Sequence, residues 1–116
     1  MAKAIASGAG VSLLIVGEGP ERESLCRLAG ELGVDSKVRF SGARQDVREI
    51  LSEADVLLHS SLAEGCAYAI TEAMCAGIPA VVTEAGAASE QIENGVSGYV
   101  VRRDDLEVFA LRISEL

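Results

Sequence analysis

The sequence predicts an α/β fold in which helices cover both faces of a parallel sheet. Short apolar runs alternate with stretches of helical periodicity, and turn residues separate the two kinds of segment. The runs are apolar at consecutive positions, which is typical of strands buried on both faces, as in a parallel sheet. Strands and helices alternating at this spacing predict a doubly wound, Rossmann-like sheet.

The first half of the chain is predicted to contain three strands and two helices. The strands are residues 11–16, 38–40 and 56–59. The first helix begins near Pro20 and ends at Gly33, and its spacing predicts a buried stripe of Leu25, Leu28, Ala29 and Leu32. The second begins with a capping-box pattern, Asp46 followed three residues later by Glu49, and is expected to bury Val47, Ile50, Leu51 and Ala54.

The second half repeats the alternation. We expect a helix at 68–76 that ends at Gly77, a strand at 79–83, a short helix at 89–93 and a strand at 99–102. A last helix is capped by Asp104 with Glu107 and carries the apolar residues Leu106, Phe109, Ala110 and Ile113. No linker or repeat interrupts the pattern, so residues 1–116 are predicted to form one domain.

Composition narrows the classes of function. The chain has 116 residues and a formal net charge of −8. It contains no basic run, which argues against binding of nucleic acid or anionic membranes. A small anion bound by the amides of a helix N-terminus remains compatible with this charge. Residues 1–16 are too weakly apolar for a signal peptide or a membrane span.

The cysteines indicate a reducing compartment and no metal site. Their number is odd, they form no CxxC pair, and they show no ligand-like spacing with His59, the sole histidine of the sequence; they are Cys26, Cys66 and Cys75. A cytoplasmic protein is the simplest interpretation.

The helix at 68–76 carries the first candidate functional residue. It is apolar on nearly every side, which is typical of a buried helix, yet Glu72 lies in its middle. An isolated carboxylate is costly to bury, so Glu72 is predicted to meet an Arg or Lys of this chain or the hydroxyls of a ligand. A structural ion pair or an exposed helix edge remain the alternatives.

The loop at 60–67 provides the second candidate. It follows a predicted strand, and α/β sheets bind ligands outside the carboxyl ends of their strands. Gly65 allows the backbone to approach a ligand closely. The amides of Ala67, Tyr68 and Ala69 would begin the helix, where a phosphate can be received.

These motifs resemble the donor-site signature of retaining glycosyltransferases with the two-domain B-type fold. The resemblance rests on residues 61–87 (SLAEGCAYAITEAMCAGIPAVVTEAGA). Three shorter motifs, LIVGEGP from Leu14, VRFSG from Val38 and EQIENGVSGYVV from Glu90, occur in the family's order and spacing. Together they extend over residues 11–116. The resemblance implies the donor-side, nucleotide-sugar-binding domain of such an enzyme.

The resemblance also implies residue roles. Glu64 would be the catalytic-site glutamate that binds hydroxyls of the donor sugar, and Glu72 would hold the ribose hydroxyls of the nucleotide. The diphosphate would lie against the loop formed by Gly65, Cys66, Ala67, Tyr68 and Ala69. Ala43 and Arg44 would lie beside the base. The resemblance implies a nucleotide-diphosphate sugar as substrate and no cofactor or bound metal.

Two departures from the family pattern affect these expectations. Cys66 and Ala67 stand where many relatives have an aromatic residue or proline, which leaves the donor sugar open. The family's first strand, a loop with an Arg and a Lys for the diphosphate, and the N-terminal acceptor domain have no counterpart before Met1. We therefore expect a fragment of a two-domain enzyme, inactive in isolation.

Two other functions remain open. One is a non-catalytic binding module or remnant that forms a homodimer through an exposed sheet edge or apolar surface. The other is a nucleotide-sugar epimerase, which would need additional acid and base residues. The base, donor sugar and acceptor cannot be deduced from these residues.

Overall fold

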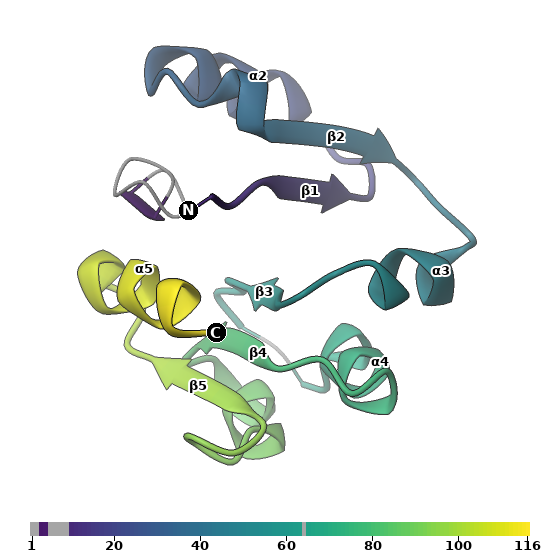
Figure 1. Ribbon diagram of the computed structural model, residues 1–116, viewed down its shortest axis with the longest axis vertical. Coiled ribbons are helices and arrows are strands. Elements are labelled where there is room, and N and C mark those ends of the chain that lie inside the picture. Colours follow the sequence, from purple (N-terminus) through teal and green to yellow (C-terminus); the bar gives the residue numbers. More distant parts are fainter. Residues whose placement is uncertain (1–2, 5–9, 64) are drawn as a thin grey trace. The chain divides into compact units, whose positions relative to one another are not determined.

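The protein consists of two compact units, Met1–Gln45 and Asp46–Leu116 (Figure 1). The computed structural model describes residues 3–4, 10–63 and 65–116. The strands pair in two sheets, one in each unit, and every pairing between named strands is parallel. This confirms the predicted parallel α/β class, with the strands shared between two sheets.

The first unit places one α-helix between two paired strands. Its elements are β1 (Leu13–Val16), α2 (Arg22–Glu31), the 3-10 turn η1 (Asp35–Lys37) and β2 (Val38–Gly42). Strands β1 and β2 pair in the register Leu13 with Val38 and Ile15 with Phe40. As predicted, Gly33 lies just beyond α2 in a left-handed conformation, with φ of 66°, which a residue with a Cβ adopts at a cost.

The apolar stripe of α2 is exposed, contrary to the prediction. Leu25, Leu28 and Leu32 are 40%, 46% and 52% exposed, and Ala29 is the buried residue of the helix. Helical periodicity identifies which residues share a face, but burial requires a neighbouring surface wide enough to cover that face. The sheet of this unit has two strands and is narrow. Of the stripe, only Ala29, which has the smallest side chain, is buried.

The second unit is built around a three-stranded sheet with the order β3–β4–β5. Its elements are α3 (Val47–Ser52), β3 (Leu57–His59), α4 (Tyr68–Cys75), β4 (Ala80–Thr83), the 3-10 turn η2 (Gly86–Gln91), β5 (Gly98–Val101) and α5 (Leu106–Glu115). All four residues of β4 are buried, as the consecutive apolar pattern predicted for an internal strand. The short helix expected at 89–93 is instead the 3-10 turn at 86–91.

Helices cover both faces of this sheet, as predicted (Figure 1). On one face, Ala80 and Val82 of β4 pack in a cluster with Ile70 of α4. Successive strand residues point to opposite faces, so Val81 and its register partner Tyr99 belong to the other face. There, the guanidinium of Arg112 on α5 lies 4.5 Å from the centroid of the Tyr99 ring.

Two predicted helix caps are wrong. Asp105, not Asp104, is the residue that precedes α5, and its side chain accepts a hydrogen bond from the Val108 N–H at 3.1 Å. The capping acceptor must lie directly before the first helical residue, and sequence patterns locate that boundary only to within a residue or two. Asp46 does precede α3, but within the described part of the chain its side chain makes no capping hydrogen bond.

Substitutions at Asp105 and Asp104 test which of the two residues caps α5. Asp105→Ala removes the acceptor for the Val108 N–H, and we expect it to lower the free energy of unfolding by about 1 kcal/mol. Asp104→Ala removes the same charge one residue earlier and should change it by less than about 0.5 kcal/mol. Urea unfolding followed by circular dichroism measures both. Equal losses in the two variants would contradict the assignment of the cap to Asp105.

Candidate functional site

The loop at 60–67 lies where the sequence predicted a binding site, at the carboxyl edge of the β3–β4–β5 sheet. Because the three strands are parallel, the segments that follow His59, Thr83 and Val101 all leave the sheet at this edge. Glu64 belongs to this loop but lies outside the described residues. Its predicted contact with the donor sugar therefore remains a prediction.

Side chains from the other two strand ends hold the first half of the loop. The hydroxyl of Thr83, the last residue of β4, donates to the Ser61 carbonyl at 2.9 Å. Arg103, two residues after β5, donates to the Leu62 carbonyl. These two bonds join the loop to the end of β4 and to the segment after β5, so the sheet positions the backbone of Ser61 and Leu62.

The second half of the loop leads into α4, whose N-terminus points donors at this edge. The Ile70 and Thr71 N–H groups both donate to the Ala67 carbonyl, at 3.0 and 3.4 Å. Within the helix itself, the N–H groups of Tyr68 and Ala69 have no carbonyl to which they can donate. The Ala67 N–H, which the sequence assigned to the same role, donates to the Oε1 atom of Gln91 at 3.3 Å. Two of the three predicted amides are thus available to an anion.

The electrostatics of α4 differ from those of the other described α-helices. Each of the others has an acidic residue in its first turn, namely Glu23 in α2, Glu49 in α3 and Glu107 in α5. The first turn of α4 has none. A negative side chain there would neutralise the positive end of the helix dipole. In a chain of net charge −8, α4 therefore keeps a positive N-terminus.

Gly65 and Cys66 are both exposed. A Cβ built on Gly65 meets nothing within 4 Å. Packing against its described surroundings therefore does not require a glycine here. The predicted close approach of a ligand at Gly65 stays a prediction. Cys66 forms no disulfide within the described part of the chain.

The structure corrects the argument for Glu72. Helix α4 is not buried on every side, because Ile70 and Ala73 are its buried residues while Glu72 itself is exposed. The helix packs along one stripe only, and small apolar residues outside that stripe tolerate contact with water. Glu72 therefore needs no polar partner for its own stability, and its predicted role rests on the resemblance and on its position.

That position is compatible with a ligand that extends from the start of α4. Glu72 lies four residues after Tyr68, and residues at this spacing share one face of a helix about 6 Å apart along its axis. Glu72 also lines a surface groove of about 630 Å³ between α3 and α4, whose other walls include Arg48 and Cys75. Packing of Leu51 on α3 with Ala73 and Ile78 holds the two helices together beneath it.

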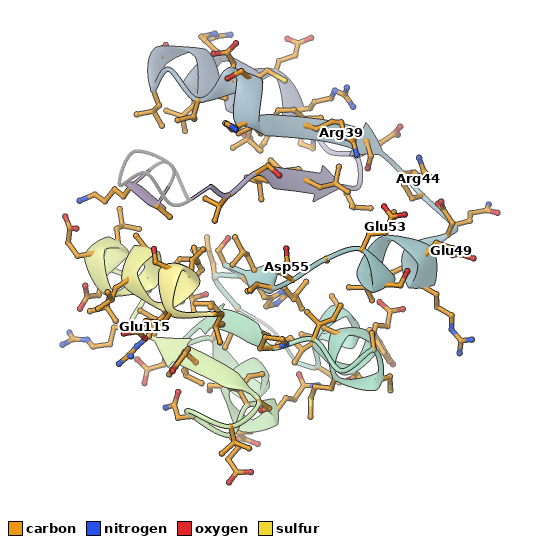
Figure 2. The ribbon with its side chains drawn as sticks, in the orientation of Figure 1. Arg39, Arg44, Glu49, Glu53, Asp55 and Glu115 are labelled. Carbon is orange, nitrogen blue, oxygen red and sulfur yellow. The ribbon has the colours of Figure 1, made fainter. Side chains whose placement is uncertain are left out.

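The remaining predicted residues, Ala43 and Arg44, belong to the first unit. Both are exposed and follow β2 directly, and Figure 2 shows Arg44 in the segment after that strand. The described residues contain no group of three or more His, Cys, Asp or Glu side chains that could hold a metal ion. None of the described helices is long and apolar enough to span a membrane.

Sequence reasoning missed three residues of this edge: Thr83, Gln91 and Arg103. Thr83 and Arg103 could have been suspected, because each lies at or just after the carboxyl end of a predicted strand. Gln91 carried no such signal, since it lies inside a segment expected to be helical.

A parallel α/β unit with a helix N-terminus at the carboxyl edge of its sheet defines the class of Rossmann-like folds. Residues 1–116 match the model of the family described as Glycosyl transferases group 1, and the chain belongs to this family.

Curated relatives agree with this assignment. The chain is 36% identical over 114 residues to the lipopolysaccharide core biosynthesis glycosyltransferase LpsE of Rhizobium meliloti. This alignment covers 98% of this chain and 34% of LpsE. It is 34% identical over 93 residues to the N-acetyl-alpha-D-glucosaminyl L-malate synthase of Bacillus anthracis, covering 80% of this chain and 24% of that protein. The chain thus spans about a third or less of the length of these relatives.

Solved structures share the fold. HepE of Anabaena in complex with UDP is 27% identical, with a TM-score of 0.82 over 98% of this chain and 34% of that one. TarM of S. aureus superposes with a TM-score of 0.92 over 99% of this chain and 23% of that one, at 21% identity, which supports the fold alone.

Proposed function

We propose that this chain is the donor-binding part of a retaining glycosyltransferase and binds a nucleotide-diphosphate sugar. The observation that carries the proposal is the N-terminus of α4, whose first two N–H groups have no carbonyl to bind within the helix and whose first turn has no acidic residue. A diphosphate is the kind of group that such a helix end attracts. Family membership, and a relative solved with UDP, support the nucleotide as the source of that diphosphate.

The parts of the donor then map onto the second unit in order. The diphosphate accepts hydrogen bonds from the Tyr68 and Ala69 N–H groups beside Gly65. The ribose hydroxyls donate to Glu72, one turn further along α4. The donor sugar lies toward Glu64.

In this proposal the chemistry is transfer with retention at the anomeric carbon. The bond between that carbon and the diphosphate oxygen breaks, and its electron pair leaves with the diphosphate. The α4 amides stabilise the negative charge that develops there. The acceptor hydroxyl forms the new bond on the same face and gives its proton to the departing diphosphate. The proposal assigns donor binding, not the complete transfer, to these 116 residues.

The ribose assignment is tested by Glu72→Ala. Removing a charged acceptor of ribose hydroxyls should raise the Kd for UDP by about tenfold or more, because hydrogen bonds to charged groups contribute about 1.5 to 3 kcal/mol. Isothermal titration of the 116-residue chain with UDP, GDP and ADP measures the Kd for each nucleotide. Glu93→Ala is the matched control, because it removes an exposed carboxylate from the same unit and should leave the Kd unchanged.

A modified nucleotide separates ribose recognition from a general charge effect. The 2′,3′-dideoxy analogue of UDP lacks the hydroxyls that Glu72 is proposed to bind, so the wild-type chain and Glu72→Ala should bind it equally. Binding of UDP that is unaffected by Glu72→Ala would rule out the ribose assignment. Absence of binding of any of the three nucleotides by the folded wild-type chain would favour a non-catalytic module with another ligand.

A further inference from the structure

Helix α4 is capped by a side chain from another part of the chain. Its N-cap residue is Ala67, whose methyl group cannot accept a hydrogen bond. In a capping box, the backbone N–H of the N-cap residue is bound by a Glu or Gln at the third helical position. In α4 that position is Ile70, which is fully buried in the core.

Gln91, the last residue of η2, takes this role. Its Oε1 atom accepts from the Ala67 N–H at 3.3 Å, and its Nε2 atom donates to the Thr71 hydroxyl at 3.0 Å. One half-buried amide thus joins the end of the loop to the residue one turn into the helix. Tyr68 and Ala69 lie between these two residues in the sequence, and their N–H groups are proposed to donate hydrogen bonds to the diphosphate.

The chemistry of this cap is as informative as its position. An amide oxygen accepts a hydrogen bond as a carboxylate does, but it carries no net charge. The N-termini of α2, α3 and α5 each have an acidic residue, and α5 is capped directly by Asp105. A carboxylate at the position of Gln91 would cap α4 equally well and would repel a bound diphosphate.

We propose that Gln91 is a positioning residue that fixes the start of α4 without neutralising it, so that the Tyr68 and Ala69 amides are held ready for the diphosphate. This inference rests on the proposed function. It adds that the cap must be neutral as well as hydrogen-bonded, which a purely structural role would not require.

Two substitutions separate the hydrogen bond from the charge. Gln91→Met has a similar size but cannot hold the Ala67 N–H, so hydrogen exchange of the Ala67 amide, followed by NMR, should accelerate. Gln91→Glu keeps the acceptor, and the Thr71 hydroxyl can reverse its bond and donate, so exchange at Ala67 should remain slow. We nevertheless expect Gln91→Glu to raise the Kd for UDP on the order of tenfold, because it places a negative charge beside the diphosphate. Its binding of uridine, which lacks phosphates, should not change.

Ser114→Glu is the charge control, because it adds the same charge on α5, on the opposite face of the sheet. It should leave binding of both ligands unchanged. The inference is overturned if Gln91→Met leaves exchange at Ala67 unaltered, or if Gln91→Glu binds UDP as the wild-type chain does. Failure of the wild-type chain to bind any of UDP, GDP and ADP would instead reject the proposed function. In that case, exchange at Ala67 in Gln91→Met still decides whether Gln91 fixes the start of α4.

Discussion

Gly98→Ala is expected to prevent folding of the second unit. Gly98 begins β5 and pairs with Ala80 of the central strand, and its φ is 150°, a conformation that residues with a Cβ rarely adopt. A Cβ at this position would lie 1.9 Å from the Ala80 carbonyl oxygen and 2.8 Å from its carbonyl carbon. Ala80 is fully buried, so its backbone cannot retreat without separating β4 from β5. We expect a loss of more than about 4 kcal/mol in the free energy of unfolding.

Gly30→Ala is the matched control for this prediction. Gly30 is an exposed residue of α2, and a Cβ there meets nothing within 4 Å. Alanine is the better helix former, so this variant should be stabilised by about 0.5 to 1 kcal/mol. Urea unfolding, monitored by circular dichroism and by the NMR amide signals of residues 46–116, distinguishes the two. A Gly98→Ala protein whose free energy of unfolding lies within about 1 kcal/mol of the wild-type value would show that β4 and β5 do not pair in this register.

Ile70→Ala is expected to produce the second largest effect. Ile70 is fully buried and packs in the cluster with Ala80, Val82 and Ile92. Removing three side-chain carbons from a close-packed site leaves a cavity, which should cost about 2 to 5 kcal/mol of stability. Ile70→Val removes one carbon and should cost about 0.5 to 1.5 kcal/mol. Thermal and urea unfolding of the two variants measure this series.

Leu111→Ala provides the comparison for Ile70→Ala, because Leu111 is a helical residue that is 52% exposed. Its loss should change stability by less than about 0.5 kcal/mol. Equal destabilisation by the two alanine variants would contradict the position of the core between α4 and the sheet. Where Ile70→Val remains folded, its Kd for UDP should equal that of the wild type, because the Ile70 side chain points into the core and away from the proposed ligand.

The carboxyl edge of the sheet could be located from sequence because it depends on local patterns. The apolar run before Thr83 predicted a strand at 79–83, and β4 is Ala80–Thr83. The loop at 60–67 and the helix after it were placed correctly because each boundary is marked by a change of periodicity. The family resemblance was also available from the sequence, since its motifs are contiguous segments in a fixed order.

Burial of helix faces was less predictable. The leucines of α2 and the carboxylate of Glu72 were both expected to be covered, and both are exposed. Hydrophobic periodicity reports which side chains share a face of a helix. Whether that face is buried depends on the width and position of the surface that packs against it, which is a property of other segments.

The sequence by itself therefore determined the parallel α/β class, the presence of a strand at 79–83 and the segment that forms the proposed donor site. The tertiary structure alone decided how that segment is held. Thr83, Gln91 and Arg103 bind its backbone from positions 22, 24 and 41 residues away in the chain. A hydrogen bond over such a separation leaves no periodic trace in the sequence, because it depends on where the folded strands bring two distant segments together.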